Sequence, residues 1–530
     1  MADWTKAMDA AALPEHGMRR VELNGVPIVL VHAGERLRAF GGDCPHAGAH
    51  LDEGALCNGR IVCPWHKAAF DIDDGERLEP PALEGLASYP VRVEGGAVLV
   101  DLQTQQRPRA ERKPRAASAA AATRRFAIVG GGAAGAAVAA TLLEGDAACE
   151  VTLYAAEPEA PYDRTCLSKF VPAGEMKPGE VPPILPDAVA HDPRLRIEHA
   201  EVRHFDARTR RVELADGREA SFDAVALASG SVAQRPDVPG AELGNIFTLR
   251  NVRDAGAILA ALAPGEHALM LGDSFIGLET AAALRQRGVD VTIVAPGGEP
   301  LQKQLGARVG ALFREWHEAH GVVFRRAKAV GFIGETEVDT VELDDGWTAR
   351  AKAVIVGMGV KPATRFIGGI ELDDDGGISV DAAMRACPGV YAVGDIARFP
   401  LGERKLRIEH WRVAQQHARV AARNMLREQS GQAGADADAA TAAAAEAYED
   451  VPFFWTQHYG QRVDYLGHAE DWDDPVMSGK PGDERFGVLY GRDGRLLAAL
   501  ACGYGREMAL LSERMRERLS IDAARETLGF

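Results

Sequence analysis

The stretch "DCPHAGAHLDEGALCNGRIVCPWHKAAFD" at residues 43–71 contains two short Cys/His pairs. Cys44 and His46 form a Cys-x-His pair, and Cys63 and His66 form a Cys-x₂-His pair further along. A Cys₂His₂ zinc finger keeps its cysteines in one pair and its histidines in another. This sequence instead supplies one thiolate and one imidazole from each of two loops.

Mixed pairs of this kind suit a [2Fe–2S] cluster in which the cysteines bind one iron and the histidines bind the other. The spacing therefore predicts a Rieske centre, with Cys44 and Cys63 as thiolate ligands and His46 and His66 as imidazole ligands. Residues 20–102 also resemble Rieske ferredoxin domains, and their short apolar runs broken by Gly are typical of strands and turns. We expect an all-β Rieske domain over residues 1–104.

Two residues beside these ligands depart from the usual pattern or add to it. Lys67 stands where Rieske domains usually have Gly, so it could strain the loop, and its charge would favour the reduced cluster. Cys57 lies between the loops, but the second loop has no further Cys. The disulfide between the loops of respiratory Rieske proteins is therefore unavailable, and we expect Cys57 to serve packing.

The composition describes a large globular protein. The chain has 530 residues, 46% of them hydrophobic, which is enough for roughly three or four domains. A formal net charge of −17 disfavours nucleic acid and anionic membranes as partners. The N-terminus lacks a signal-peptide pattern and no apolar run is long enough to span a membrane, so we expect a cytoplasmic protein. Seven Cys are too few for a disulfide framework.

A glycine motif begins at residue 130, inside "FAIVGGGAAGAAVAATLLE". Gly130, Gly132 and Gly135 give G-x-G-x-x-G between a predicted strand and a predicted helix. Such glycines allow a tight turn and the close approach of a pyrophosphate to the helix N-terminus. Glu157 ends the next predicted strand, where a carboxylate can bind an adenosine ribose. These residues predict a dinucleotide-binding domain.

A second, weaker motif occurs in "HALMLGDSFIGLETAAALRQRGVDVTIVAP" at residues 267–296. Gly272 and Gly277 occupy the outer positions, but Ser274 replaces the middle Gly. The next strand ends at Ala295 rather than at an acid, so NADH and NADPH are not clearly separated. Glu299 either supplies the ribose carboxylate or is a loop acid, and we slightly favour NADH.

Several motifs from residue 125 onwards resemble the FAD- and NAD(P)-dependent pyridine nucleotide oxidoreductases. Within them, the chain is most similar to the branch of apoptosis-inducing-factor-like proteins and ferredoxin reductases. The motifs are "PYDRTCLSK" (161–169), "ALASGS" (226–231), "GDSFIGLE" (272–279), "VIVGMGVKPAT" (354–364), "GVYAVGDIARF" (389–399) and "RIEHWRVAQQHARVAARNM" (407–425).

The resemblance implies a multidomain protein in which the NAD domain is inserted into the FAD domain, both of them Rossmann-like α/β domains. A C-terminal α+β interface domain follows, beginning near Phe454 and Trp455. The expected parts after the Rieske domain are a linker at 105–124, FAD-binding regions at 125–247 and 366–447 (the second with a linker at its end), an NAD(P)-binding domain at 248–365 and the interface domain at 448–530.

The resemblance also implies roles for individual residues. Lys169 would approach the flavin ring and pair with Glu279, so that a fixed cation stabilises the reduced flavin. Trp411 would lie along the ring. The remaining residues implied to bind FAD are Arg164, Gly394 and Asp395, and Asp395 would bond the ribityl chain.

Three further features have competing interpretations. Cys166 is either a buried spectator or a redox thiol beside the flavin. His317 and His320 resemble a metal pair, but they lack the His-Glu-x-x-His register, so we favour a surface helix. Residues 105–124 and 431–447 have linker composition, and the first is basic enough to be an alternative docking strip for an acidic partner.

The sequence therefore predicts an electron-transfer enzyme. NAD(P)H would reduce FAD, and FAD would reduce the fused cluster, which would pass electrons to an unidentified redox acceptor. A flexible tether spanning roughly 25 Å would keep the cluster near the flavin. The alternatives are a disulfide or peroxide reductase that uses Cys166 and a slow-turnover redox sensor. A homodimer is possible.

Overall fold

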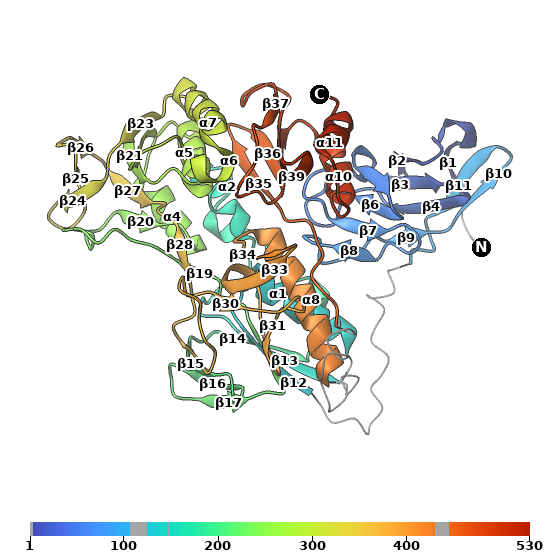
Figure 1. Cartoon of the computed structure of the whole chain (residues 1–530). Coiled ribbons are helices and arrows are strands. Elements are labelled where there is room, and N and C mark those ends of the chain that lie inside the picture. The colour runs from blue at the N-terminus through green and yellow to red at the C-terminus, as the bar shows by residue number, and fades with distance from the viewer. Residues whose placement is uncertain (1–3, 107–123, 147, 430–444) are drawn as a thin grey trace.

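The computed structural model describes residues 4–106, 124–146, 148–429 and 445–530. The chain forms an N-terminal β domain, two α/β domains and a C-terminal domain, in the order that the sequence predicts (Figure 1). Most of both predicted linkers lies outside the described residues, as does most of the basic stretch considered as a docking strip.

The N-terminal domain consists of small antiparallel sheets. Successive apolar residues of its longer strands enter two different cores in turn. One core contains Val29, Phe40 and Phe70, and the other contains Ile28 and Leu30. The strand orders are β1(Trp4–Asp9)-β11(Ala97–Asp101)-β10(Val91–Glu94), β2(Gly17–Leu23)-β3(Val26–Ala33)-β4(Arg36–Gly41)-β9(Ser88–Tyr89) and β5(Ala55–Cys57)-β6(Arg60–Val62)-β7(Ala69–Asp71)-β8(Arg77–Glu79).

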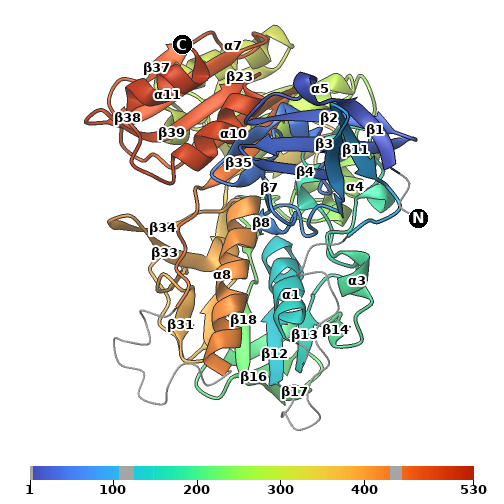
Figure 2. The ribbon, with the colours of Figure 1, turned by 90° about the vertical axis from the view of Figure 1, so that its right-hand side faces the viewer.

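The first α/β domain contains a six-stranded sheet that is parallel except at β31 (Arg385–Cys387). Its outer strands β31 and β32 come from beyond the second α/β domain, which explains why a strand pattern returns so late in the sequence. Helices α1 (Ala133–Gly145) and α8 (Trp411–Gln429) lie side by side on this sheet (Figure 2). The order is β14(Leu195–Glu198)-β13(Cys149–Tyr154)-β12(Arg124–Val129)-β18(Ala224–Leu227)-β32(Val390–Ala392)-β31(Arg385–Cys387).

The second α/β domain contains a five-stranded parallel sheet flanked by helices. Its helices are α4 (Val252–Ala261), α5 (Phe275–Gln286) and α7 (Ala307–Ala319). The order is β20(Ile246–Thr248)-β27(Ala353–Val356)-β21(His267–Leu271)-β22(Asp290–Ala295)-β23(Val323–Arg326), and a small sheet β24(Ala329–Ile333)-β25(Thr340–Leu343)-β26(Thr348–Arg350) adjoins it.

The C-terminal domain packs against the second α/β domain. Val463, Phe486 and Leu500 from its sheet share one apolar core with Leu278 and Phe313 from helices α5 and α7. The sheet is β35(Phe453–His458)-β36(Gln461–Gly467)-β39(Arg495–Cys502)-β38(Phe486–Arg492)-β37(Val476–Ser478), followed by α10 (Gly505–Arg514) and α11 (Ile521–Leu528). This arrangement fixes β35 between the two α/β domains.

Shorter elements connect these domains. The antiparallel pair of β19 (Ser231–Ala233) and β28 (Val360–Pro362) crosses between the α/β domains. No helix in the described part of the chain is long and apolar enough to cross a bilayer. The shorter elements are α2 (Phe170–Ala173), α3 (Asp187–Ala190), α6 (Gln302–Leu305), β15 (Val202–Asp206), β16 (Arg211–Leu214), β17 (Glu219–Ser221), β19 (Ser231–Ala233), β28 (Val360–Pro362), β29 (Ile367–Gly368), β30 (Ile378–Ser379), β33 (Ala397–Leu401) and β34 (Arg404–Arg407).

Candidate functional site

The predicted cluster ligands lie together at the tips of two similar loops. The Cys44 N–H donates to Ala49 O at 2.8 Å, and the Cys63 N–H donates to Ala68 O at 2.8 Å. The Nδ1 atoms of His46 and His66 are 3.1 Å apart. A hydrogen bond with the Cys63 thiol and burial raise the pKa of the Cys44 thiol. One thiol pair and one imidazole pair therefore converge, which is the donor set that a [2Fe–2S] cluster with two ligands per iron requires.

Lys67 follows the second histidine and has a left-handed backbone, with φ of 59°. This conformation explains why Gly is the easier residue here. The Lys67 side chain is 0% exposed, and its Nζ donates to Asp464 Oδ2 at 2.7 Å and to Pro64 O at 2.5 Å. The charge that we expected beside the cluster is thus paired with a carboxylate of the C-terminal domain, a partner that the sequence did not reveal.

A cavity of about 820 Å³ collects most of the predicted flavin and nicotinamide residues at the junction of the α/β domains. The pair of Lys169 and Glu279 lies on its wall, as do residues from both glycine motifs, among them Ser274. Glu157 is not among the residues that line this cavity. Its carboxylate accepts hydrogen bonds from Arg164, which does line the cavity, and from Tyr162 Oη at 2.5 Å. The predicted residues on the wall are Gly132, Arg164, Lys169, Glu279, Gly394, Asp395 and Trp411.

The glycines of the first motif fit a bound pyrophosphate. A Cβ on Gly135 would lie 1.9 Å from Gly130 O, so this Gly is required for packing of strand against helix. A Cβ on Gly132 would meet no atom within 4 Å and would project into open space. The room beside Gly132 is where the backbone could approach the phosphates of FAD.

These two glycines give a testable contrast. Gly132→Ala is expected to leave the unfolding free energy of the apoprotein unchanged and to lower its FAD affinity, because the methyl group occupies phosphate space. Gly135→Ala is expected to cost roughly 1–3 kcal/mol of stability through overpacking. Chemical denaturation and FAD fluorescence titration measure the two effects, and equal FAD affinity of Gly132→Ala and the unaltered chain would contradict the assignment.

In the second motif, Ser274 caps helix α5. Its Oγ accepts from the Gly277 N–H at 3.3 Å, which explains a Ser where dinucleotide motifs have Gly. Gly272 remains obligatory, because its φ is 104° and a Cβ there would lie 2.4 Å from Gly357 O. Glu299 accepts from Arg314 Nε at 2.8 Å and from Arg326 at 2.9 Å, so its carboxylate is already bonded.

Glu279 and Lys169 join three domains. Lys169 Nζ donates to Glu279 Oε2 at 3.0 Å, and both side chains are buried. The same carboxylate accepts from the Ser168 hydroxyl, from Thr456 Oγ1 at 3.0 Å and from the Gln457 N–H at 2.8 Å. The pair predicted from family resemblance is therefore formed, and four donors fix its carboxylate on the cavity wall.

Asp395 is held in a similar way at the other side of the cavity. Its Oδ2 accepts from Ser231 Oγ at 2.8 Å and from Arg250 at 2.9 Å. Gly394 has φ of 71° and opens the short turn that carries this carboxylate. The turn points Asp395 toward the space predicted to hold the ribityl chain.

Trp455 connects the two predicted redox sites. Its ring centroid is 4.2 Å from that of His66, and Lys169 Nζ lies 5.5 Å from the Trp455 centroid. Trp455 belongs to β35 of the C-terminal domain. From the sequence we expected this residue only to lie near the start of that domain. One aromatic ring thus separates a predicted cluster ligand from the predicted flavin lysine.

Residues 124–418 match the family described as "Pyridine nucleotide-disulphide oxidoreductase". The chain belongs to this family. Residues 3–90 match "Rieske [2Fe-2S] domain" and residues 453–527 match "Reductase C-terminal". As a member with these domains, the protein is an FAD-dependent oxidoreductase that uses NAD(P)H and carries a [2Fe–2S] cluster.

Known relatives fall in the two groups that the sequence motifs resemble. Apoptosis-inducing factor 3 of Homo sapiens is 32% identical over 511 residues, covering 94% of this chain and 81% of the relative. The anthranilate 1,2-dioxygenase system ferredoxin–NAD(+) reductase component of Burkholderia cepacia is 34% identical over 380 residues, covering 70% of this chain and 88% of the relative.

Solved structures show the same reductase fold. The covalent putidaredoxin reductase–putidaredoxin complex superposes with a TM-score of 0.68 at 26% identity, covering 77% of this chain and 96% of that one. Fdr9 superposes with a TM-score of 0.65 at 30% identity, covering 76% of this chain and 98% of that one. The family fold thus extends over both α/β domains and the C-terminal domain.

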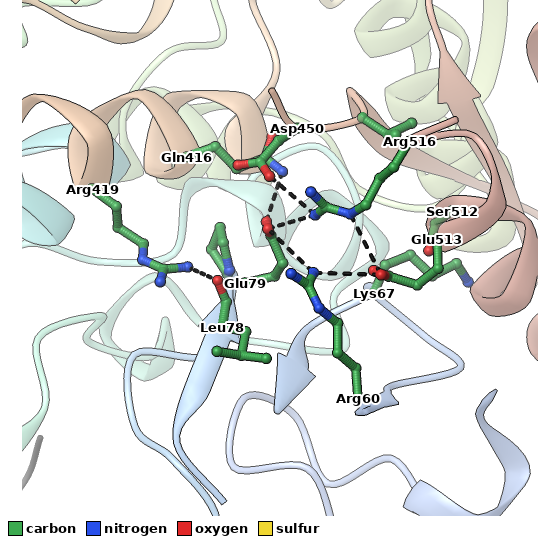
Figure 3. A network of polar contacts seen from close by, with 12 residues as sticks. Arg60, Lys67, Leu78, Glu79, Gln416, Arg419, Asp450, Ser512, Glu513 and Arg516 are labelled. Carbon is green, nitrogen blue, oxygen red and sulfur yellow. Dashed lines mark hydrogen bonds and ion pairs between the residues drawn. The ribbon is translucent and has the colours of Figure 1, made fainter. Parts of the chain in front are cut away.

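In this oxidoreductase the Rieske domain is docked on the reductase rather than held only by a tether. Glu79, at the end of β8, accepts from Gln416 at 3.0 Å and from Arg516 at 2.6 Å (Figure 3). It also forms an ion pair with Arg412 at 3.3 Å. These partners come from α8 and from the C-terminal domain. A buried ion network of this kind fixes the domain's position, because separating it would leave several charges unpaired.

Asp450 completes the network from the segment before β35. Arg516 donates to Asp450 Oδ1 at 3.0 Å. Burial and the neighbouring Glu79 carboxylate raise the pKa of Asp450 to about 7. Asp450 therefore binds a proton in the folded protein that it would release at the same pH when unfolded, so this group's contribution to stability falls as pH rises from its ordinary pKa towards 7.

Cys166 does not have the surroundings of a reactive thiolate. The side chain is buried, and burial followed by the nearby Asp163 raises the pKa of its thiol to about 12. All seven cysteines lie in the described residues, and none of them forms a disulfide. Cys166 therefore has the properties of the buried spectator. Cys57 is half-buried beside the small core where the Rieske sheet meets α10, in keeping with the packing role.

The surface-helix interpretation is wrong for His317, which lies on α7. His317 is 0% exposed and faces the C-terminal domain, where it contacts His458 and Tyr459. His320, just beyond α7, is exposed as expected. The sequence does not show this difference, because His458 in β35 and Tyr459 just after it contact His317 from more than a hundred positions away.

Proposed function

We propose that this oxidoreductase passes electrons from NAD(P)H through FAD to its own fused Rieske cluster, and from there to a separate redox acceptor. The observation that carries the proposal is Trp455, whose ring lies next to His66, with centroids 4.2 Å apart, and 5.5 Å from Lys169 Nζ. FAD, when bound, converts the two-electron hydride of NAD(P)H into single electrons that the cluster can take.

The residues of the chain supply positioning and charge. Lys169, fixed by Glu279, would stabilise the negative charge that reduction places on the flavin ring. His66 would present the cluster to Trp455, and the Glu79 network would hold that contact in place. The distance between the redox sites is thereby set by packing and does not depend on the predicted tether.

Outgoing electrons require access to the cluster. His46 lines a cavity of about 1020 Å³ between the Rieske, FAD and C-terminal domains, and Trp65 at its rim is 40% exposed. We propose that the acceptor approaches this face, where both His46 and His66 line the cavity. The domain limits, the cytoplasmic location and a homodimer remain predictions.

Replacement of Trp455 tests the internal route. Trp455→Leu is expected to slow NADH-driven reduction of the cluster while leaving reduction of the flavin by NADH at its original rate. Anaerobic stopped-flow absorbance separates the two phases. Trp65→Leu is the matched control, because the Trp65 ring also lies beside His66 but Trp65 is not among the residues that line the predicted flavin cavity.

Two outcomes separate the proposal from its alternatives. Unchanged cluster reduction in Trp455→Leu would contradict the route through this ring. If Cys166→Ser lost turnover with disulfides or peroxides while cluster reduction stayed intact, the alternative of a disulfide or peroxide reductase that uses Cys166 would be supported.

A further inference from the structure

The second cluster loop, residues 63–67, is bonded to charged side chains of the C-terminal domain. Arg462 and Asp464, both on β36, face this loop. Arg462 Nη2 donates to Pro64 O at 3.1 Å, and Lys67 Nζ donates to the same oxygen at 2.5 Å. One carbonyl oxygen of the loop therefore accepts from two cationic side chains, one from each domain.

Asp464 holds both of these side chains in place. Its Oδ2 accepts from Lys67 Nζ at 2.7 Å, and its Oδ1 lies 2.9 Å from Arg462 Nε. Asp464 and Lys67 are buried, and Lys67 Nζ lies 5.4 Å from the ring centroid of Phe453. Two cations share one carboxylate, so these three groups leave one net positive charge beside the loop, where burial limits its screening by salt and water.

The Pro64 carbonyl is connected to the cluster ligand Cys63 through a single peptide unit. That peptide carries the Trp65 N–H, which hydrogen-bonds to the Cys63 sulfur, as does the His66 N–H. Donors that draw electron density towards the Pro64 oxygen make the Trp65 N–H a stronger donor in turn. Hydrogen bonds to the sulfurs set the potential of such a cluster, because they stabilise the negative charge that reduction adds.

The first cluster loop lacks this arrangement. The N–H groups of His46 and Ala47 hydrogen-bond to the Cys44 sulfur in the matching way. Pro45, which follows Cys44 as Pro64 follows Cys63, is exposed and lines the cavity between the domains. Within the part of the chain that the structure describes, no side chain donates to the Pro45 carbonyl. The polarised peptide is therefore specific to the loop that meets the reductase.

The backbone of Lys67 points to the same interface. Its φ of 59° is a left-handed conformation that costs a residue with a side chain free energy, and such a conformation persists where surrounding contacts fix it. The contacts that fix it come from the reductase, because Asp464 binds the Lys67 ammonium and Arg412 Nη2 donates to Lys67 O at 3.0 Å. A Gly here would relieve the strain but would supply no donor to Pro64 O.

We propose that Arg462 and Lys67, held by Asp464, raise the reduction potential of the docked Rieske cluster, an inference that rests on the proposed electron route. Both are positioning residues, because they act on the Cys63 sulfur through the Pro64–Trp65 peptide. A raised potential favours the passage of a single electron from the flavin side to the cluster. The reduction adds one electron and forms or breaks no bond, and the net positive charge at the loop offsets part of the added negative charge.

The Arg462→Met variant tests this role, because it removes the charge and the donor but keeps an unbranched apolar side chain. Dithionite titration of the full-length holoprotein with redox mediators, followed by electron paramagnetic resonance, measures the midpoint potential of the cluster. Loss of a bond from a charged group is expected to shift the equilibrium roughly tenfold towards the oxidised cluster, which is about 59 mV for a one-electron couple. Lys67→Met is expected to shift the potential in the same direction.

The matched control is Arg492→Met. Arg492 lies on β38 of the same domain, where it is exposed and pairs with Asp471, so this variant loses the same charge away from the loop. Its cluster is expected to keep the potential of the unaltered protein. An unaltered potential in both Arg462→Met and Lys67→Met would overturn the inference.

Urea denaturation, followed by the visible circular dichroism of the cluster, distinguishes this role from a purely structural one. Variants at Arg462 and Lys67 that lower the urea midpoint and leave the potential unaltered would show that these residues only hold the domain, and would overturn the inference. The titration needs neither NADH nor the flavin, because dithionite and the mediators reduce the cluster directly. If NADH failed to reduce the cluster of the unaltered protein, the proposed function would fail, and the potentials of the variants would still decide this inference.

Discussion

Replacing Lys169 with Met is expected to lower the rate of NADH-driven electron transfer by roughly 100- to 1,000-fold, the usual effect of removing one preorganised charge at a reacting centre. The ammonium group is buried on the cavity wall and held by Glu279 and Thr165 O, at 3.0 and 3.1 Å. Single-turnover stopped-flow measurements at saturating NADH give this rate.

In this variant Glu279 loses its buried counter-charge but keeps three other donors, from Ser168, Thr456 and the Gln457 N–H, and the rate is compared only for protein that is folded and has bound FAD. Lys361→Met is the matched control, since Lys361 is exposed on β28 and lies outside the cavity lining. A Lys169→Met protein with bound FAD and an unaltered rate would contradict the role that we give to this lysine.

Glu79→Gln is expected to destabilise the docked Rieske domain by about 3–5 kcal/mol, the typical cost of removing one partner from a buried ion pair. Arg412 and Gln416 on α8 and Arg516 near the C-terminus all bond this carboxylate, which is 4% exposed. Without it the two guanidinium groups lose their shared counter-charge. Urea denaturation followed by the visible circular dichroism of the cluster measures the change.

The undocked domain should also receive electrons more slowly, because the contact between His66 and Trp455 depends on docking. Glu35→Gln, an exposed change in the turn between β3 and β4, is the control and is expected to leave both properties unaltered. An equal urea midpoint for Glu79→Gln and the unaltered protein would show that the ion network does not hold the domain.

Much of this fold follows from short-range patterns. The cluster loops are recognisable because Cys44 and His46, like Cys63 and His66, are neighbours in the sequence and a loop of a few residues brings them to one point. The glycine at position 135 is equally local, since its contact, Gly130 O, lies one turn away. Such spacing predicts the sites of both cofactors, but it does not predict how the domains meet.

The contacts between domains join residues that are distant in sequence. Lys67 and Asp464 are separated by 397 positions, and Glu79 and Arg412 by 333. No periodicity or composition connects such residues, and a buried Lys has the same letter as an exposed one. His317 was assigned to the surface for the same reason, because only the packing of β35 on α7 shows that it is buried.

The most direct test of the electron route is anaerobic titration of the purified protein with NADH, followed by optical absorbance and electron paramagnetic resonance. The account predicts that the flavin bleaches and that a reduced Rieske signal appears without any added mediator or second protein. A flavin that is fully reduced by NADH while the cluster stays oxidised would contradict it.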